Sequence, residues 1–201
     1  MLRRTLLLAC ALGLAPLVCP AQIKIEATDL VNHPFSVAFA SGGKLKVKVR
    51  SGEVRILGTD DDRISVELSG KKAWDAKDTR VRFEQKSDTA ELKVSGGPKS
   101  DLTITVRIPS NTDLHARVPA GEVRVQSITG NKDIEIHAGD LTIEVGNSAD
   151  YSHVEASVVT GDLSAAPFGE NKSGLFRSFE KTGPGRYRLH AHVGAGELTL
   201  Q

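Results

Sequence analysis

A short repeat, in which glycine is followed by an acid and then by alternating apolar and polar residues, constrains the fold of this chain most strongly. The pattern Gly-[Asp/Glu]-[Leu/Val]-x-[Ile/Val/Leu] occurs at residues 52–56, 121–125, 139–143 and 196–200, with a weaker copy at 161–165. Glycine permits a sharp bend, and period-two alternation is typical of a strand with one buried face. The copies that begin at residues 121, 139 and 161 are 18 and 22 residues apart, which fits one coil of a solenoid. The repeat predicts architecture and not chemistry.

Alternating strands account for most of the remaining sequence. They are predicted at residues 44–50, 63–68, 90–94, 102–108, 134–136, 154–158, 187–193 and 198–200. The best helical candidate, residues 73–79, is short. Residues 167–181 lack the alternation and carry three phenylalanines among charges, so we expect an irregular loop that caps an open end. The prediction is an all-β, single-domain β-solenoid or β-roll of stacked short strands with Gly-[Asp/Glu] turns.

The first 21 residues have the composition of a secretory signal. Arg3 and Arg4 precede a mostly apolar run from Leu6 to Val18, and small residues end at Ala21. The run is too short and interrupted to predict a membrane span. Lipidation at Cys10 is an alternative, but the apolar segment before that cysteine is short for a signal. We therefore predict a signal peptide at 1–21 and one β-strand-repeat domain at 22–201, with no integral membrane span after signal removal.

Composition excludes several classes of function for residues 22–201. Both cysteines, Cys10 and Cys19, lie in the predicted signal, so the mature domain has no disulfide, thiol nucleophile or thiolate metal site. It carries 24 basic and 25 acidic residues, and its aromatic residues are scattered. This balance lacks the electrostatic footprint of nucleic-acid binding and indicates no strong attraction to anionic membranes.

The order of these motifs resembles a bacterial family, the putative-adhesin β-strand-repeat proteins. Residues 45–71 match its opening pattern of a strand, a Ser-Gly-Glu-Val turn, a Gly-x-Asp turn and a second strand. The similarity resumes at residues 108–114, continues through 138–141 and closes at 194–198. It covers about two thirds of the mature chain. The resemblance implies an all-β solenoid outside the inner membrane, and it brings no catalytic residues with it.

Two motifs resemble those of penicillin-recognising enzymes, namely Ser-x-x-Lys at residues 41–44 and Lys-Thr-Gly at 181–183. That chemistry needs a serine at a helix N-terminus and a lysine one turn later on the same face. Ser41 and Lys44 instead enter a predicted strand through two glycines, and the same pattern recurs at residues 69–72. We interpret both motifs as chance and predict no catalytic residues.

Histidines and acids offer two further candidate sites. His190 and His192 leave the same face of a predicted strand, as half of a metal site would, and His137 and His153 complete it only if the fold brings them near. The acids after the repeat glycines would stack about 4.8 Å apart and repel, which invites a cation or alternation with basic residues. We favour solvated histidines, and carboxylates that accept turn N–H groups or face water, as we do for Asp60, Asp61 and Asp62. The prediction is no metal and no cofactor.

Trp74 is the only tryptophan. An exposed tryptophan marks contact with a sugar or protein, whereas a buried one would plug a solenoid end, which we favour. The predicted function is an exported, non-enzymatic binding or scaffolding module of the cell envelope, in the periplasm or at the cell surface. Its partner is predicted to be an envelope protein or glycan. The alternatives are a polysaccharide hydrolase, disfavoured because the acids are spread one per turn with few aromatic sugar platforms, and a component of envelope-stress signalling, which rests on the resemblance alone.

Overall fold

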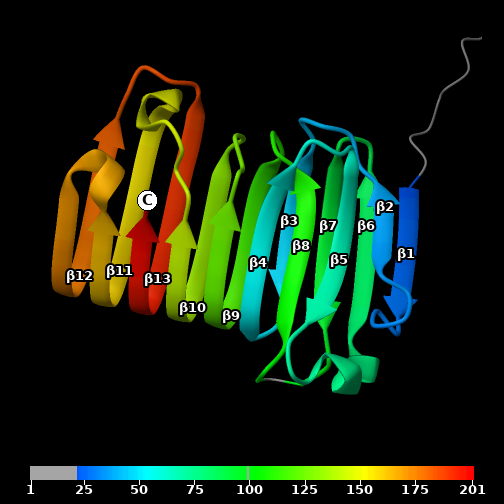
Figure 1. The fold of residues 1–201 in the computed structure, drawn as a ribbon. Helices are drawn as coiled ribbons and strands as arrows, with labels where there is room; N and C mark the ends of the chain where they lie inside the picture. Colours follow the sequence, from blue (N-terminus) through cyan, green and yellow to red (C-terminus); the bar gives the residue numbers. More distant parts are fainter. Residues whose placement is uncertain (1–21, 99) are drawn as a thin grey trace, which may run out of the picture.

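The computed structural model describes residues 22–201 except residue 99, so the predicted signal peptide and Cys10 lie outside the described residues. The described part of the chain is all-β, as predicted, and its 13 strands form one mixed sheet (Figure 1). The predicted helical segment is a 3-10 helix, η1 (Ala73–Asp78), and two shorter 3-10 turns are η2 (Ser148–Asp150) and η3 (Ala166–Phe168). The strands are β1 (Gln22–Thr28), β2 (Phe35–Ala38), β3 (Lys44–Val49), β4 (Gly52–Thr59), β5 (Arg63–Ser69), β6 (Arg80–Lys86), β7 (Thr89–Ser95), β8 (Thr103–Pro109), β9 (Asp113–Gln126), β10 (Lys132–Ile143), β11 (Tyr151–Ala165), β12 (Glu170–Thr182) and β13 (Tyr187–Leu200).

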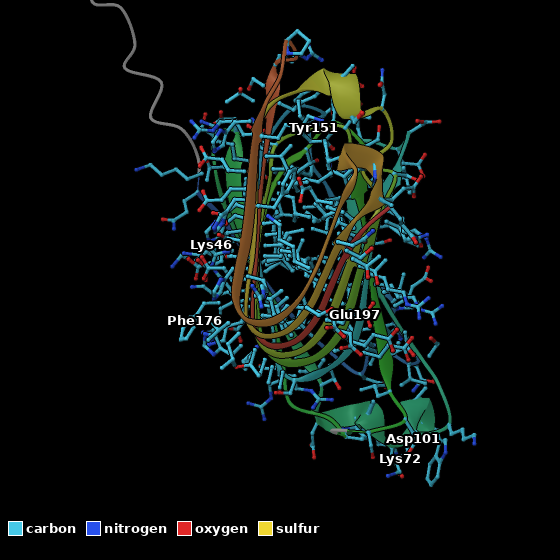
Figure 2. All side chains as sticks on the ribbon, turned by 90° about the vertical axis from the view of Figure 1, so that its left-hand side faces the viewer. Lys46, Lys72, Asp101, Tyr151, Phe176 and Glu197 are labelled. Atoms are coloured by element: carbon cyan, nitrogen blue, oxygen red, sulfur yellow. The ribbon has the colours of Figure 1, made fainter. Side chains whose placement is uncertain are left out.

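Long strands that bend once divide this sheet into two facing arms. β9, β10, β11 and β13 each pass through a repeat glycine, and we call the part before it the first arm and the part after it the second arm. The segments 187–193 and 198–200, predicted as two strands, are therefore one bent strand. Closer to the N-terminus the arms are separate strands, with β3 and β7 in the first arm and β4 and β8 in the second. Figure 2 shows the resulting U-shaped cross-section, with side chains filling the space between the arms.

The bends coincide because the repeat glycines stack directly on one another. Gly52 pairs with Gly121, Gly121 with Gly139, and Gly161 with Gly196. Their φ angles are 140°, 133°, 116°, 133° and 138° for residues 52, 121, 139, 161 and 196, so the predicted bends are confirmed, and all five glycines have a positive φ. A Cβ atom on Gly139 would lie 2.0 Å from the Gly121 carbonyl oxygen. Glycine is therefore required both for the backbone angle and for the close approach of neighbouring strands.

The spatial order of the strands departs from their order in the sequence. β9 and β10 are neighbours one 18-residue coil apart, because Gly121 lies against Gly139 as the spacing predicted. The copy at residue 161 does not follow the copy at 139 in space. β13 lies between β10 and β11 and runs parallel to both, so the order is β9, β10, β13, β11, β12 (Figure 1). The interpretation of 22 residues as one coil is wrong, because the segment from β12 to β13 supplies the intervening layer.

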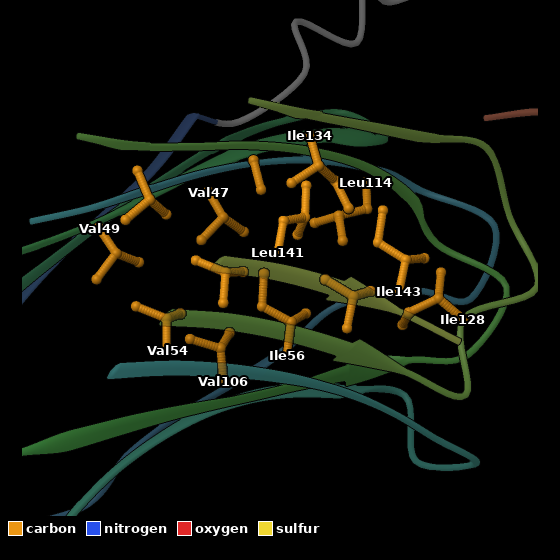
Figure 3. Packing of buried hydrophobic residues seen from close by; sticks show 14 of the residues in the cluster. Val47, Val49, Val54, Ile56, Val106, Leu114, Ile128, Ile134, Leu141 and Ile143 are labelled. Carbon is orange, nitrogen blue, oxygen red and sulfur yellow. The ribbon is translucent and has the colours of Figure 1, made fainter. Parts of the chain in front are cut away.

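Apolar residues from the two arms meet in one continuous core. The predicted inward residues Val54, Ile56, Val123, Val125, Leu141, Ile143, Leu198 and Leu200 are all fully buried. Arg55 and Arg124 between them are exposed, and Thr142 and Thr199 are half-buried, so the predicted alternation is confirmed. Figure 3 shows Val47 and Val49 of the first arm across the core from Val54, Ile56 and Val106 of the second. The period-two pattern after each glycine thus sets which side of each arm faces inward.

The predicted irregular loop at residues 167–181 is a strand over most of its length. β12 pairs antiparallel with β11 along both arms and ends the stack, so a regular element fulfils the expected capping role. Phe168 and Phe179 are buried and pack with ring centroids 5.6 Å apart, whereas Phe176 is 79% exposed. Alternation is weak in β12 because most of its residues face solvent, which removes the buried half of the pattern.

Lys132 is the only charged side chain among the buried residues of the described chain. Its Nζ donates a hydrogen bond to the Tyr151 hydroxyl at 2.6 Å, and that hydroxyl donates to the Val145 carbonyl at 3.0 Å. Burial lowers the pKa of Lys132 to about 8 and raises the pKa of Tyr151 to about 12. This pair occupies the open end of the U, where Figure 2 places Tyr151 between the arms.

We expect the free energy of unfolding to rise with pH between about 8 and 10. Lys132 loses its proton near pH 8 in the folded state and near pH 10.5 in the unfolded state, so the unfolded state binds more protons in this window. The slope attributable to this lysine is about 1.4 kcal/mol per pH unit. Above pH 10 the raised pKa of Tyr151 reverses the trend, because the folded state then retains the proton. Urea unfolding at pH 7.5, 8.5, 9.5 and 10 measures it, and Lys132→Met removes the lysine contribution. An equal slope in that variant would contradict the assignment.

Candidate functional site

Five of the six histidines of the chain lie on the outer side of the first arm. The alternation that buries Leu114, Ile134 and Leu189 turns their neighbours outward, so polar side chains of β3, β9, β10, β13 and β11 share one surface. We call it the histidine face; it comprises Lys46, His115, Arg117, Asp133, Glu135, His137, His153, Glu155, Arg188, His190 and His192. Figure 2 places Lys46 on this side and Glu197 on the outside of the second arm.

At its centre the pairing of β9, β10 and β13 arranges six side chains as two rows of three. The first row is His115, Asp133 and His190, and the second, two residues further along each strand, is Arg117, Glu135 and His192. The Asp133 carboxylate accepts hydrogen bonds from both flanking rings, with Nδ1 of His115 at 2.7 Å and Nδ1 of His190 at 2.8 Å. Arg117 joins the rows, with Nη1 at 3.1 Å from Asp133 and Nη2 at 2.7 Å from Glu135. Two carboxylates are therefore surrounded by nitrogen donors.

Asp133 stays ionised well below neutral pH in this setting. Burial alone would raise the pKa of its carboxyl group, but hydrogen bonds from Arg117 and His190 outweigh that effect and lower the pKa to about 2. The carboxylate is held from three sides by groups on paired strands, so its position is fixed by the sheet rather than by a loop. Such a carboxylate orients the two imidazoles that donate to it.

Ser157 and His192 form a second contact on this face, with the serine hydroxyl 2.8 Å from Nδ1 of the ring. His192 also lies opposite Glu135 on the neighbouring strand, so serine, histidine and glutamate follow one another across three strands. Acyl transfer further requires N–H groups aimed at the developing oxyanion. Ser157 lies in β11, which pairs with β13 on one side and β12 on the other, so the sheet ladder takes the surrounding N–H groups. In the described residues, the backbone N–H groups around Ser157 are therefore engaged in strand pairing.

Two hollows in this face lie on either side of the central cluster. The larger, of about 580 Å³, is lined by His115, Asp133, His153, Glu155, Arg188 and His190 among others. The smaller, of about 330 Å³, is lined by Lys48, Lys93, Arg117, Glu135 and His137 among others. The two hollows make the face uneven, and both acidic and basic side chains line them. Leucines and valines such as Leu114 and Val118 also line these hollows, so the face offers apolar as well as charged contacts, as protein-binding surfaces do.

The acids after the repeat glycines do stack, on the outside of the second arm. Glu53, Glu122 and Asp140 are successive partners, and Asp162 pairs with Glu197. Arg55 and Arg124, two residues further along, form ion pairs with Glu53 and Glu122. In the other copies that second position holds threonine or serine, and Thr199 donates a hydrogen bond to Glu197 at 2.9 Å. These two arginines offset the repulsion between the carboxylates at one end of the ladder. This is the alternation with basic residues that the sequence analysis considered.

The remaining candidates from the sequence do not converge on a site. Ser41 lies in the turn before β3, and Lys181 lies in β12, five strands further along the stack. Asp62 accepts a hydrogen bond from the Ser41 N–H, as expected for a turn residue. Trp74 is 67% exposed, so its interpretation as a buried plug is wrong. Its ring Nε1 donates to the Lys71 carbonyl at 2.9 Å, within a solvent-exposed tip.

The sequence prediction singled out four histidines of this face but not the residues that join them. The 18-residue coil carries the signal that was missed, because it places His115 beside Asp133 and Arg117 beside Glu135. His137 and His153 lie on the same face as His190 and His192, but they line different hollows. The partners that the fold brings to His190 are instead Asp133 and Glu135.

A solved structure with this architecture fits the described chain. A protein from Clostridium sporogenes ATCC 15579, described as a putative cell adhesion protein, superposes with a TM-score of 0.51 at 14% sequence identity, over 83% of this chain and 97% of that one. The chain has the fold of that bacterial protein. A putative adhesin from Bacteroides fragilis NCTC 9343 aligns over 90% of this chain and 99% of its own, at 9% identity and a TM-score of 0.23.

Other comparisons do not extend this likeness. No family model matches the chain, and no curated protein matches its sequence. Among the described residues, none of the helices has the length and apolar character needed to cross a lipid bilayer. The fold shared with the Clostridium sporogenes protein is therefore a likeness of architecture.

Proposed function

We propose that this chain is an exported, non-enzymatic binding or scaffolding module of the bacterial cell envelope, with the histidine face as its partner surface. In this proposal residues 1–21 are the secretory signal, and residues 22–201 work in the periplasm or at the cell surface. The stacked coils of β9, β10, β13 and β11 act as a β-solenoid that holds the surface rigid. The partner is an envelope protein or glycan.

The observation that carries this proposal is the concentration of five histidines and their charged neighbours on one hollowed face of a rigid sheet. Core packing does not require those side chains, because the inward positions are already filled by aliphatic residues. Outward-facing polar residues gathered on one surface support a recognition role in this proposal. The fold shared with a putative cell adhesion protein supports the same class of function.

Charge reversal within the larger hollow tests the surface directly. Arg188 is exposed and lines that hollow, and Arg124 is exposed on the opposite arm. Biolayer interferometry of the purified protein against a set of purified envelope glycans and envelope proteins should find a saturable partner. We expect Arg188→Glu to weaken that binding at least ten-fold and Arg124→Glu to leave it unchanged. Equal loss in both variants, or no saturable partner in the set, would argue against this surface.

The protein should show no turnover of penicillin-type substrates, esters or common glycans, with or without added zinc or calcium. The described residues place Ser157 beside His192, but the neighbouring N–H groups belong to the ladder, and Ser41 stands apart from Lys181. Chromogenic and reducing-end assays check this expectation. Reproducible hydrolysis that disappears in Ser157→Ala, His192→Ala or Ser41→Ala would replace the binding role with a catalytic one.

A further inference from the structure

Three potential ligands converge at the centre of the histidine face. Asp133 and Glu135 are successive outward residues of β10, and His190 of β13 lies directly opposite Asp133. One donor atom of each residue lies within 4.8 Å of the donor atoms of the other two. Tetrahedral ligands that bond a metal at about 2.0–2.2 Å stand roughly 3.4 Å apart, so small side-chain movements would bring these three donors onto one ion.

We propose that Asp133, Glu135 and His190 form a binding site for one divalent transition-metal ion of the zinc class. Two carboxylates and one imidazole are ligands that zinc accepts. The imidazole favours zinc, cobalt or nickel over calcium and magnesium, which prefer oxygen ligands alone. Three protein ligands leave a coordination position open to solvent, as in zinc sites that bind an external ligand.

Neighbouring residues are arranged as supports for such a site. His115 donates to Asp133 from the side opposite His190, which fixes the carboxylate between the two strands. His192 lies opposite Glu135, on the same strand as His190. All three proposed ligands are half-buried and belong to paired strands, so their backbone positions are held by the sheet ladder. Sites built on strands keep their geometry better than sites built on loops.

Arg117 is the competitor of the metal ion in this arrangement. Its guanidinium bridges the two carboxylates, at 3.1 Å from Asp133 and 2.7 Å from Glu135, and so supplies positive charge where the ion would bind. Metal binding must displace this contact and take the place of the proton between His190 and Asp133. Removing the guanidinium should therefore strengthen metal binding, whereas a site that merely pairs charges would gain no metal affinity from that change.

Isothermal titration of the tag-free, chelator-stripped protein with zinc chloride tests the site, and cobalt absorption reports its geometry. We expect one ion per chain with a micromolar Kd. Glu135→Gln and His190→Gln should each weaken binding at least ten-fold, and Arg117→Gln should strengthen it at least three-fold. His33→Gln is the matched control, because His33 lies in the loop between β1 and β2, away from this face, and should leave the Kd unchanged. Thermal melting of each variant establishes that it is folded.

Two results would overturn the metal site. One is zinc binding that remains equally tight in a folded Glu135→Gln/His190→Gln double variant, since the ion would then sit elsewhere. The other is a Kd weaker than about 1 mM in both the unchanged protein and the Arg117→Gln variant. The site goes beyond the proposed binding role and fails separately from it. Partner binding measured in the presence of EDTA tests that role without metal, while the titration uses zinc alone.

Discussion

Gly139→Ala should destabilise the protein by about 2–6 kcal/mol, more than any exposed substitution on the two arms. The backbone at this position has a φ of 116°, which costs other residues about 1–3 kcal/mol. The new Cβ would also lie 2.0 Å from the Gly121 carbonyl oxygen, so the neighbouring coil must shift at a further cost of about 1–3 kcal/mol. Gly139 lies in the middle of the stack, where a shift disturbs pairing on both sides. Urea denaturation followed by circular dichroism measures the loss.

Gly146→Ala separates the two causes of that loss. Gly146 also has a positive φ, of 71°, but a Cβ there meets nothing within 4 Å. We therefore expect this control to show the backbone cost alone, about 1–2 kcal/mol. If the two variants lose the same stability, the close stacking of the repeat glycines has no energetic weight, and the bends would need glycine only for its backbone angle.

Leu141→Ala should cost about 2–5 kcal/mol, because it leaves a cavity in the core between the arms. Leu141 is fully buried, and its strand pairs on both sides, so the surrounding backbone has little freedom to close the gap. Thr142→Ala, one residue further along the same strand, is the matched control. Its side chain points out of the second arm and is only half-buried, so its removal should change stability by less than about 1 kcal/mol.

Thermal and chemical unfolding of both variants checks this pair. A smaller loss for Leu141→Ala than for Thr142→Ala would mean that the inward and outward faces of β10 are exchanged. That outcome would contradict the register in which β9, β10 and β13 pair, and with it the placement of Asp133 and Glu135 on the outer surface.

Local rules predicted most of the strands, but they missed β1, β2 and β6 and could not give the spatial order. Period-two alternation predicted the buried face of every repeat copy, and the glycine that opens each Gly-[Asp/Glu] motif predicted the position of the bend. Both are short-range features, set by the sterics of a few consecutive residues. The position of β13 between β10 and β11 depends on which distant edges meet, and the spacing of the copies carries no record of it. β12 was not predicted because its local pattern is weak. An end strand needs little apolar alternation, since most of its residues face solvent.

The candidate site shows the same difference between features set by local sequence and features set by long-range strand order. His190 and His192 were recognised as sharing one face, because strand periodicity alone determines that. The approach of His190 to Asp133 spans 57 residues and exists only through the inserted strand. His115 and Asp133, by contrast, are one regular coil apart, so a search at that spacing would have paired them. Contacts between neighbouring regular coils were therefore accessible from sequence, and contacts made by the inserted strand were not.

The position of β13 between β10 and β11 also determines when the sheet can be completed during synthesis. β10 and β11 leave the ribosome before the 14 residues that will separate them, and each then carries an edge that nothing yet occupies. Long unpaired strand edges tend to pair with other chains, so a partly synthesised polypeptide is the species at risk of aggregation. A chain whose sheet is completed only when β13 is present is less prone to aggregate if it stays unfolded until β13 has been synthesised. Export as an extended polypeptide, which is part of the proposed function, would meet that need, because the sheet would then close only after the chain has crossed the membrane.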